Sequence, residues 1–164
     1  MTHNDIDFAD YHRIALHTGC ETVDDVIRWA DAEIAQIEMP PVPLIDVSLG
    51  KSQSVAQICA LLKTLVADPN DCSALNAVLT NIATMVCDDQ LSVDVAIDRI
   101  YDYAKMYAPN DDLRWAFISL AEDLSCIRDG VYWTNDASAL RQPLLEAINR
   151  FCAAETDADD ITKS

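Results

Sequence analysis

The sequence predicts an all-α fold. Apolar residues recur at helical spacing along most of the chain, and no segment alternates apolar and polar residues long enough to form a strand. Helix-start signals fall near residues 52, 71, 92, 110 and 135, which leaves room for helices of about five turns joined by short loops. We therefore expect a single domain of about seven to eight helices over residues 1–154, built as an irregular bundle or a HEAT-like array of helical pairs.

The first helix is predicted over residues 5–18, with Gly19 just past its end. A second helix begins at Thr22, because Asp25 follows three residues later and completes a variant of the capping box. Its apolar pattern runs to Met39, where the Pro-rich segment 40–43 breaks the helix and forms a stiff connection.

The rest of the chain follows the same pattern. Residues 44–49 form a helical turn or an extended piece. Five later helices are predicted to begin at Ser52, Asp71, Ser92, Asn110 or Asp111, and Asn135 or Asp136. Pro143 lies inside the last apolar pattern, so a kink or a late start is expected there. Residues 155–164 are predicted to be an acidic, disordered tail.

The net charge of the chain indicates which classes of partner it can bind. The sequence has 28 acidic and 11 basic residues, a net charge of −17 that is spread over the whole chain. A folded domain of this charge repels nucleic acid and anionic membranes and attracts cationic surfaces. No signal peptide or membrane-spanning run is visible, and the six cysteines include no CxxC pair, so we expect a cytoplasmic location.

Motifs for catalysis are missing from the sequence. Three isolated glycines rule out a Gly-rich phosphate loop, and no HExxH or GxSxG motif occurs. The three histidines all lie within the first 17 residues, and the spacing of His12 and His17 is poor for one metal ion on a helix face. We predict that the protein is not an enzyme, with no catalytic residues, metal or cofactor.

The helix predicted over residues 92–108 presents the most informative surface. Its apolar residues fall on one arc, whereas Asp94, Asp98 and Asp102 follow a flank at four-residue steps, with Tyr101 between them and the core. Such a row is either a solvated acidic face or a docking face for a basic partner. Because the whole chain is acidic, we take these four residues as a predicted partner-binding site.

Two pairs of acidic residues adjoin this helix. Asp88 and Asp89 precede its start, and Asp111 and Asp112 lie at the start of the next helix. Helix capping accounts for all four, and they are also predicted as neighbours of the docking face.

The three tryptophans differ in their predicted environment. Trp29 and Trp115 lie at the edge of apolar faces and are predicted to be core or core-rim residues. Trp133 falls in a connection and is predicted either to close the last helix or to anchor an interface.

The segment 22–49 carries a resemblance to a known family. A helix with Trp29-Ala30-Asp31 is followed by Pro40-Pro41 and by a short piece that contains Leu44-Ile45-Asp46. This arrangement resembles helical immunity proteins encoded beside bacterial polymorphic toxins, including contact-dependent growth inhibition systems. The resemblance implies a role rather than site residues: a small cytoplasmic protein that binds a cognate toxin domain and blocks it.

The resemblance and the charge lead to one prediction. We expect an immunity protein that neutralises a basic toxin domain, with a nuclease as the expected toxin, because substrate clefts of nucleases are basic. The alternative is an acidic nucleic-acid mimic or regulator that acts on DNA-binding host proteins. A carboxylate–metal enzyme and a plain helical scaffold are further alternatives. The toxin activity, the acidic face used and the oligomeric state are not specified by the sequence.

Overall fold

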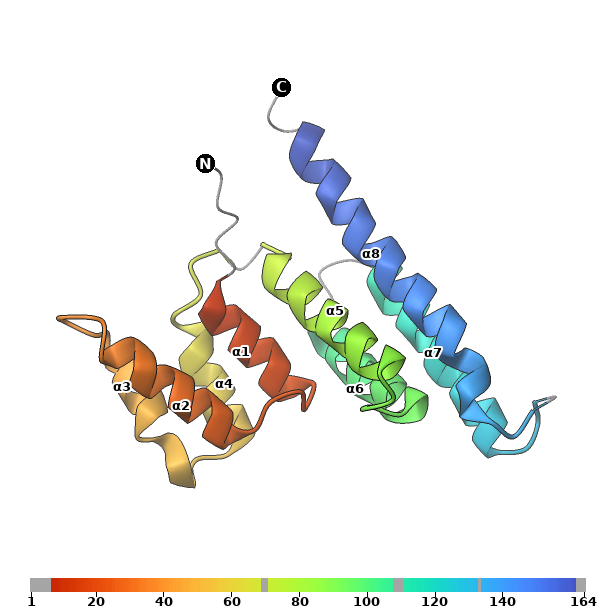
Figure 1. Cartoon of the computed structure of the whole chain (residues 1–164), viewed down its shortest axis with the longest axis horizontal. Coiled ribbons are helices and arrows are strands. Elements are labelled where there is room, and N and C mark those ends of the chain that lie inside the picture. Colours follow the sequence, from red (N-terminus) through yellow and green to blue (C-terminus); the bar gives the residue numbers. More distant parts are fainter. Residues whose placement is uncertain (1–6, 69–70, 108–110, 133, 162–164) are drawn as a thin grey trace. The chain divides into compact units, whose positions relative to one another are not determined.

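The computed structural model describes residues 7–68, 71–107, 111–132 and 134–161 (Figure 1). Within these ranges the chain forms eight α-helices and two short 3₁₀ helices, with no strand, so the predicted all-α class is confirmed. None of the described helices is long and apolar enough to cross a membrane. Pro109 and Trp133 lie outside the described residues.

The chain divides into two compact units, residues 1–78 and 79–164. The boundary falls inside α5 (Ser73–Cys87). The Pro-rich segment 40–43 therefore lies within the first unit and does not separate the two. The predicted domain over residues 1–154 thus spans the first unit and most of the second.

The first unit is built from α1 (Phe8–His17), α2 (Val23–Ile34), α3 (Val42–Ser48), η1 (Gly50–Ser52) and α4 (Val55–Lys63). Helix α1 packs against α4, and α3 packs against both α2 and α4. Apolar side chains from α1, α2, α3 and α4 form its core: Leu16, Val26, Ala30, Leu44, Val47, Ile58, Cys59 and Leu62. Trp29 packs against this core while remaining partly exposed, as predicted.

The start of α2 follows its sequence signal. The side chain of Thr22 accepts a hydrogen bond from the Asp25 amide, and Asp25 accepts one from the Thr22 amide at 2.8 Å, so the predicted capping box is confirmed. The helix ends at Ile34 and not at Met39. The proline after Met39 disfavours a helical conformation at that residue, which favours an earlier end.

Prolines open the next helix. Pro41 is the N-cap of α3 and Pro43 lies in its first turn, where a missing amide hydrogen costs nothing. Residues 44–49 are therefore mainly helical. The following helix, α4, has Ser54 and Gln57 as its capping box, so the predicted start at Ser52 is wrong. Ser52 instead belongs to η1, which places the start two residues later.

The second unit contains the end of α5, α6 (Val93–Tyr107), α7 (Asp111–Arg128), η2 (Ala137–Leu140) and α8 (Arg141–Ile161). Helix α7 packs against α6 and α8, and η2 contacts all three of these helices. Asp136 caps η2, so the predicted start of the last helix is occupied by η2. Pro143 then lies in the first turn of α8, which confirms the predicted late start.

The acidic C-terminal segment differs from its prediction. Helix α8 continues through Ile161, so residues 155–161 are helical rather than disordered. Residues 153–161 lack glycine and proline, the two residues least compatible with a helix interior.

Burial predicts unequal reactivity among the cysteines, all six of which are free. Cys59 is 5% exposed and burial raises its pKa to about 11, whereas Cys87 is exposed. Thiolate is the reactive form, so at about pH 8 alkylation of Cys59 should be at least about 100-fold slower than that of Cys87. Mass spectrometry of partly alkylated protein measures both rates. Equal rates in the folded protein would contradict the burial of Cys59.

Candidate functional site

The predicted row of carboxylates on α6 is partly paired with a cation. The Arg128 guanidinium, at the end of α7, donates to both carboxylate oxygens of Asp98, at 3.2 and 2.7 Å. It also lies 3.8 Å from Oδ2 of Asp94. One arginine therefore joins two of the three predicted aspartates and ties α6 to α7.

These ion pairs lie in solvent. The side chains of Arg128, Asp94 and Asp98 are 49%, 40% and 48% exposed. Ion pairs with this exposure contribute about 0–1 kcal/mol each, because water screens both charges. Asp94 and Asp98 can therefore exchange Arg128 for a cation of a partner at little cost.

The far end of the row has a different environment. Asp102 is exposed and has no ion pair among the described residues. Tyr101 is half-buried, and its ring lies under the ammonium of Lys105, which is 5.9 Å from the ring centroid. The lysine thus partly offsets the negative charge near Asp102.

The acidic pair before α6 has a structural role at the end of α5. Asp89 adopts a left-handed conformation (φ 57°), and the next two amides, of Gln90 and Leu91, bond back to the Met85 carbonyl. Aspartate tolerates this conformation better than most residues. Asp89 also forms an ion pair with Arg141. Asp88 is exposed, without an ion pair among the described residues.

The second pair of acidic residues lies at the start of α7. Asp111 lies 3.7 Å from the Arg114 guanidinium, and Asp112 is exposed with no ion pair in the described part of the chain. Both follow the end of α6 closely, whereas Asp89 and Asp94 lie at its beginning. The eight predicted residues therefore do not form one patch.

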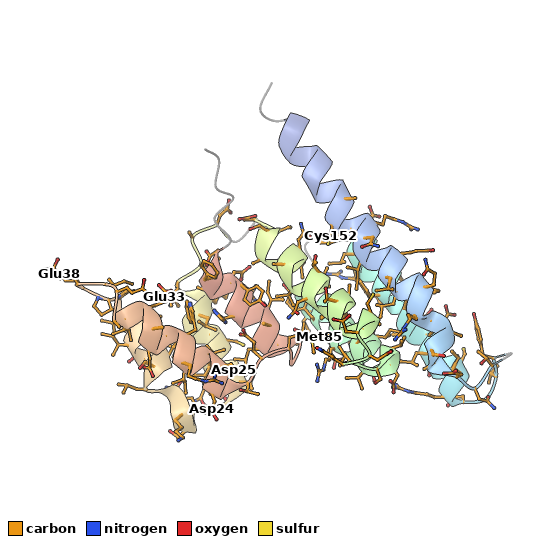
Figure 2. The ribbon with its side chains drawn as sticks, viewed as in Figure 1. Asp24, Asp25, Glu33, Glu38, Met85 and Cys152 are labelled. Carbon is orange, nitrogen blue, oxygen red and sulfur yellow. The ribbon has the colours of Figure 1, made fainter. Side chains whose placement is uncertain are left out.

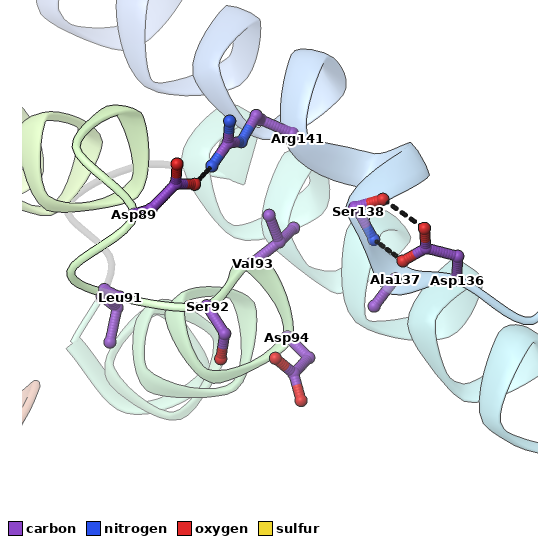
Figure 3. Close-up of a pocket in the computed structure, with 9 residues that line it drawn as sticks. All are labelled: Asp89, Leu91, Ser92, Val93, Asp94, Asp136, Ala137, Ser138 and Arg141. Carbon is purple, nitrogen blue, oxygen red and sulfur yellow. Dashed lines mark hydrogen bonds and ion pairs between the residues drawn. The ribbon is translucent and has the colours of Figure 1, made fainter.

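Two of the predicted residues do meet, in a pocket of about 320 Å³ within the second unit (Figure 3). Its lining residues come from the α5–α6 connection, the start of α6, η2 and the start of α8: Asp89, Leu91, Ser92, Val93, Asp94, Asp136, Ala137, Ser138 and Arg141. We call it the acidic pocket, because it combines three carboxylates with one guanidinium. Its volume is at the lower end of the range for ligand sites.

Arg141, the one basic residue that lines the acidic pocket, already has partners. Arg141 donates to the Val86 carbonyl at 2.8 Å and pairs with Asp89, and Figure 3 shows its guanidinium turned toward Asp89. Asp94 and Asp136 therefore lack Arg141 as a partner. Arg128 lies near Asp94 but does not line the pocket, so the three carboxylates of the lining outnumber its one guanidinium.

Hydrogen bonds favour the ionised form of the Asp94 and Asp136 carboxylates. Asp136 accepts from the Ser138 amide at 2.8 Å and from the Ser138 hydroxyl at 2.6 Å, and these bonds hold its pKa below the usual value. A hydrogen bond from the Ser92 side chain does the same for the pKa of Asp94, and Arg128 adds to the effect. Both groups are therefore negative at neutral pH and in weak acid.

Sequence reasoning missed three residues of this site. The apolar pattern predicts Asp136 only as a possible helix start, although the spacing of Asp136 and Ser138 signals a side-chain cap. Arg128 and Arg141 pair with carboxylates 30 and 52 positions away, and no local pattern in the sequence indicates such contacts.

The prediction for Trp115 is wrong. Its side chain is 65% exposed. The buried residues of α7 follow one stripe: Leu113, Phe117, Leu120, Leu124 and Ile127. At about 100° per residue Trp115 lies on the opposite face of the helix from this stripe.

Metal-binding geometry is not found among the described residues, where no group of three or more His, Cys, Asp or Glu side chains converges on a common point. The carboxylates of the acidic pocket are included in this finding. His12 instead pairs with Glu21 at 2.6 Å and stacks on Trp29, with ring centroids 4.4 Å apart. The carboxylates of the acidic pocket do not converge on one point, so each can accept hydrogen bonds from a separate donor.

Comparison of the chain with protein families, with curated proteins and with solved structures gave no match.

Proposed function

We propose that this protein is a cytoplasmic immunity protein that binds and neutralises a cognate basic toxin domain. The observation that carries the proposal is the acidic pocket, in which Asp94 and Asp136 are ionised while the single arginine is held by Asp89. The function requires neither catalysis nor a cofactor, and neither nucleic acid nor a membrane is its partner. It requires a surface that attracts and orients cations.

The pocket suits one basic side chain of the partner. A guanidinium or ammonium group that enters it would find carboxylates from the start of α6 and from the cap of η2. Charge-assisted hydrogen bonds of this kind are about twice as strong as neutral ones. Arg128, with its exposed ion pairs to Asp94 and Asp98, can turn away and leave those carboxylates to the partner.

A nuclease is the toxin class that this charge fits best. An enzyme that binds nucleic acid needs Lys and Arg side chains along its substrate cleft. Carboxylates of an inhibitor can occupy the same cations and thereby exclude the substrate. The exposed Asp88, Asp102 and Asp112 lie outside the pocket and would speed association through long-range attraction.

Affinity capture tests this function. The wild-type protein is immobilised, a lysate of the source cells is applied, and a salt gradient elutes what is bound. We expect one strongly retained basic protein whose expression alone stops growth. A ladder of DNA-binding proteins that leave at moderate salt would favour the nucleic-acid mimic instead, and an empty column would contradict both.

A further inference from the structure

Helix α3 is apolar on two opposite faces. Leu44 and Val47 are buried in the core of the first unit. At about 100° per residue, Val42, Ile45 and Leu49 point to the other side of the helix. Helices α2 and α4 cover the first face. A helix with a second apolar face that no neighbouring element covers offers an interaction surface on that side.

The exposure of this second face is large. Val42 is 68% exposed, Leu49 74% and Ile45 36%, and Met39, in the turn before the helix, is 88% exposed. We call these four residues the α3 apolar face. Single exposed apolar residues are common on proteins, but here four of them fall within eleven positions, and three of the four lie on one side of α3.

Acidic residues outnumber basic ones in the chain around the α3 apolar face. Residues 28–51 contain Asp31, Glu33, Glu38 and Asp46, against Arg28, which pairs with Asp25, and Lys51, which is exposed two positions after Leu49. Asp46 is exposed and lies on the same side of the helix as Val42. Glu38 directly precedes Met39, and Figure 2 places it at the tip of the turn between α2 and α3, with Glu33 near the end of α2. The surface thus combines an apolar centre with a negative rim.

The acidic residues near the α3 apolar face indicate which kind of partner it binds. In a dimer that used the same face twice, the mainly acidic edges of both copies would be brought together, and like charges would repel. An amphipathic helix fits this surface, because its apolar side can contact the apolar centre while lysine or arginine beside that side pairs with the acidic rim.

We propose that the α3 apolar face is a second docking site, which binds a basic amphipathic helix of the partner. The inference rests on the proposed function, since the helix belongs to the same basic protein. The α3 apolar face lies in the first unit and the acidic pocket in the second, so the two contacts are made by separate surfaces.

The test uses a defined probe, a synthetic helical peptide of leucine and lysine with all leucines on one side. Fluorescence anisotropy of the labelled peptide gives its Kd for the full-length protein. We expect the double variant Val42→Ser/Leu49→Ser to bind about tenfold more weakly or worse, and Glu38→Gln/Asp46→Asn to bind several-fold more weakly, with less dependence on salt.

A matched control removes two exposed apolar residues elsewhere. Val55 is the first residue of α4, as Val42 is of α3, and Val131 follows the end of α7; they are 42% and 78% exposed. Val55→Ser/Val131→Ser should bind the peptide within about twofold of wild type, because neither residue belongs to the α3 apolar face. A serine-for-leucine peptide should not bind.

Several outcomes would overturn the inference: no binding of the peptide to the wild-type protein, equal affinity of the Val42→Ser/Leu49→Ser variant, or equal losses in variant and control. Sedimentation that shows a wild-type dimer disrupted by Val42→Ser/Leu49→Ser would assign the face to a second copy instead. Failure of the proposed function is distinguishable, because the affinity column would then retain no toxic basic protein while the peptide still bound to α3.

Discussion

Replacing Asp94 and Asp136 with asparagine is expected to weaken binding of the captured basic partner about 10- to 100-fold, or about 1.4–2.8 kcal/mol. Both carboxylates line the acidic pocket, and Arg141 is paired with Asp89 instead. Asparagine keeps the shape of each side chain and still caps η2 through Ser138, because it is as good a cap as aspartate. Isothermal titration of the purified pair measures the loss.

The chain provides a closely matched control in its first unit. Asp24 follows Thr22-Val23 as Asp94 follows Ser92-Val93, and each is the second residue of its helix. Asp71 accepts hydrogen bonds from the amide and hydroxyl of Ser73, as Asp136 does from Ser138. Asp24→Asn/Asp71→Asn therefore makes the same change in net charge and in local structure. It should cost less than about threefold in affinity. Equal losses in the two double variants would mean that only total charge matters.

Replacing Phe117 with alanine is expected to lower the free energy of unfolding by about 3–5 kcal/mol. Phe117 is fully buried in the stripe of α7, which packs against α6 and α8. The substitution removes a large apolar side chain and leaves a cavity. A typical domain is stable by about 5–15 kcal/mol, so much of its stability would be lost. Urea unfolding followed by far-UV circular dichroism gives the difference.

Trp115→Ala is the control for this substitution, because it removes a larger aromatic side chain from the same helix. Trp115 is 65% exposed and lies opposite the stripe, so its replacement should change stability by less than about 0.5 kcal/mol. A loss as large as that of Phe117→Ala would show that Trp115 is packed, as the sequence pattern predicted.

Helices were predictable where a local signal determines them. The capping box of Thr22 and Asp25 and the late start at Pro143 depend on residues within one turn, and both predictions are confirmed. Ser52 and Ser54 show the limit. Both serines are good caps, and the choice between them depends on the 3₁₀ turn at residues 50–52, which packs against α2.

The candidate site was predictable only in part, because burial and pairing depend on tertiary contacts. The four-residue spacing of Asp94, Asp98 and Asp102 correctly indicates a common flank of one helix. It does not indicate that Arg128 takes up two of these carboxylates. The spacing also gives no sign that Asp136 and Asp94 line the same pocket, because the 41 positions between them include all of α7.

The apolar residues of α3 posed a related problem. The sequence from Val42 to Leu49 is apolar at six of eight positions if Pro43 is counted, so its pattern does not show which face is buried. Packing against α2 and α4 decides that Leu44 and Val47 face the core. The remaining face becomes visible as a surface only once those neighbours are in place.

Protection of living cells tests the central claim most directly. The toxic basic protein captured on the wild-type protein is expressed together with wild type, with Asp94→Asn/Asp136→Asn, or with the matched control Asp24→Asn/Asp71→Asn, all at equal level. The growth rate of each culture is then measured. Wild type and control should restore growth, and the pocket variant should restore it poorly or not at all. Full protection by the pocket variant would contradict recognition of the toxin through the acidic pocket.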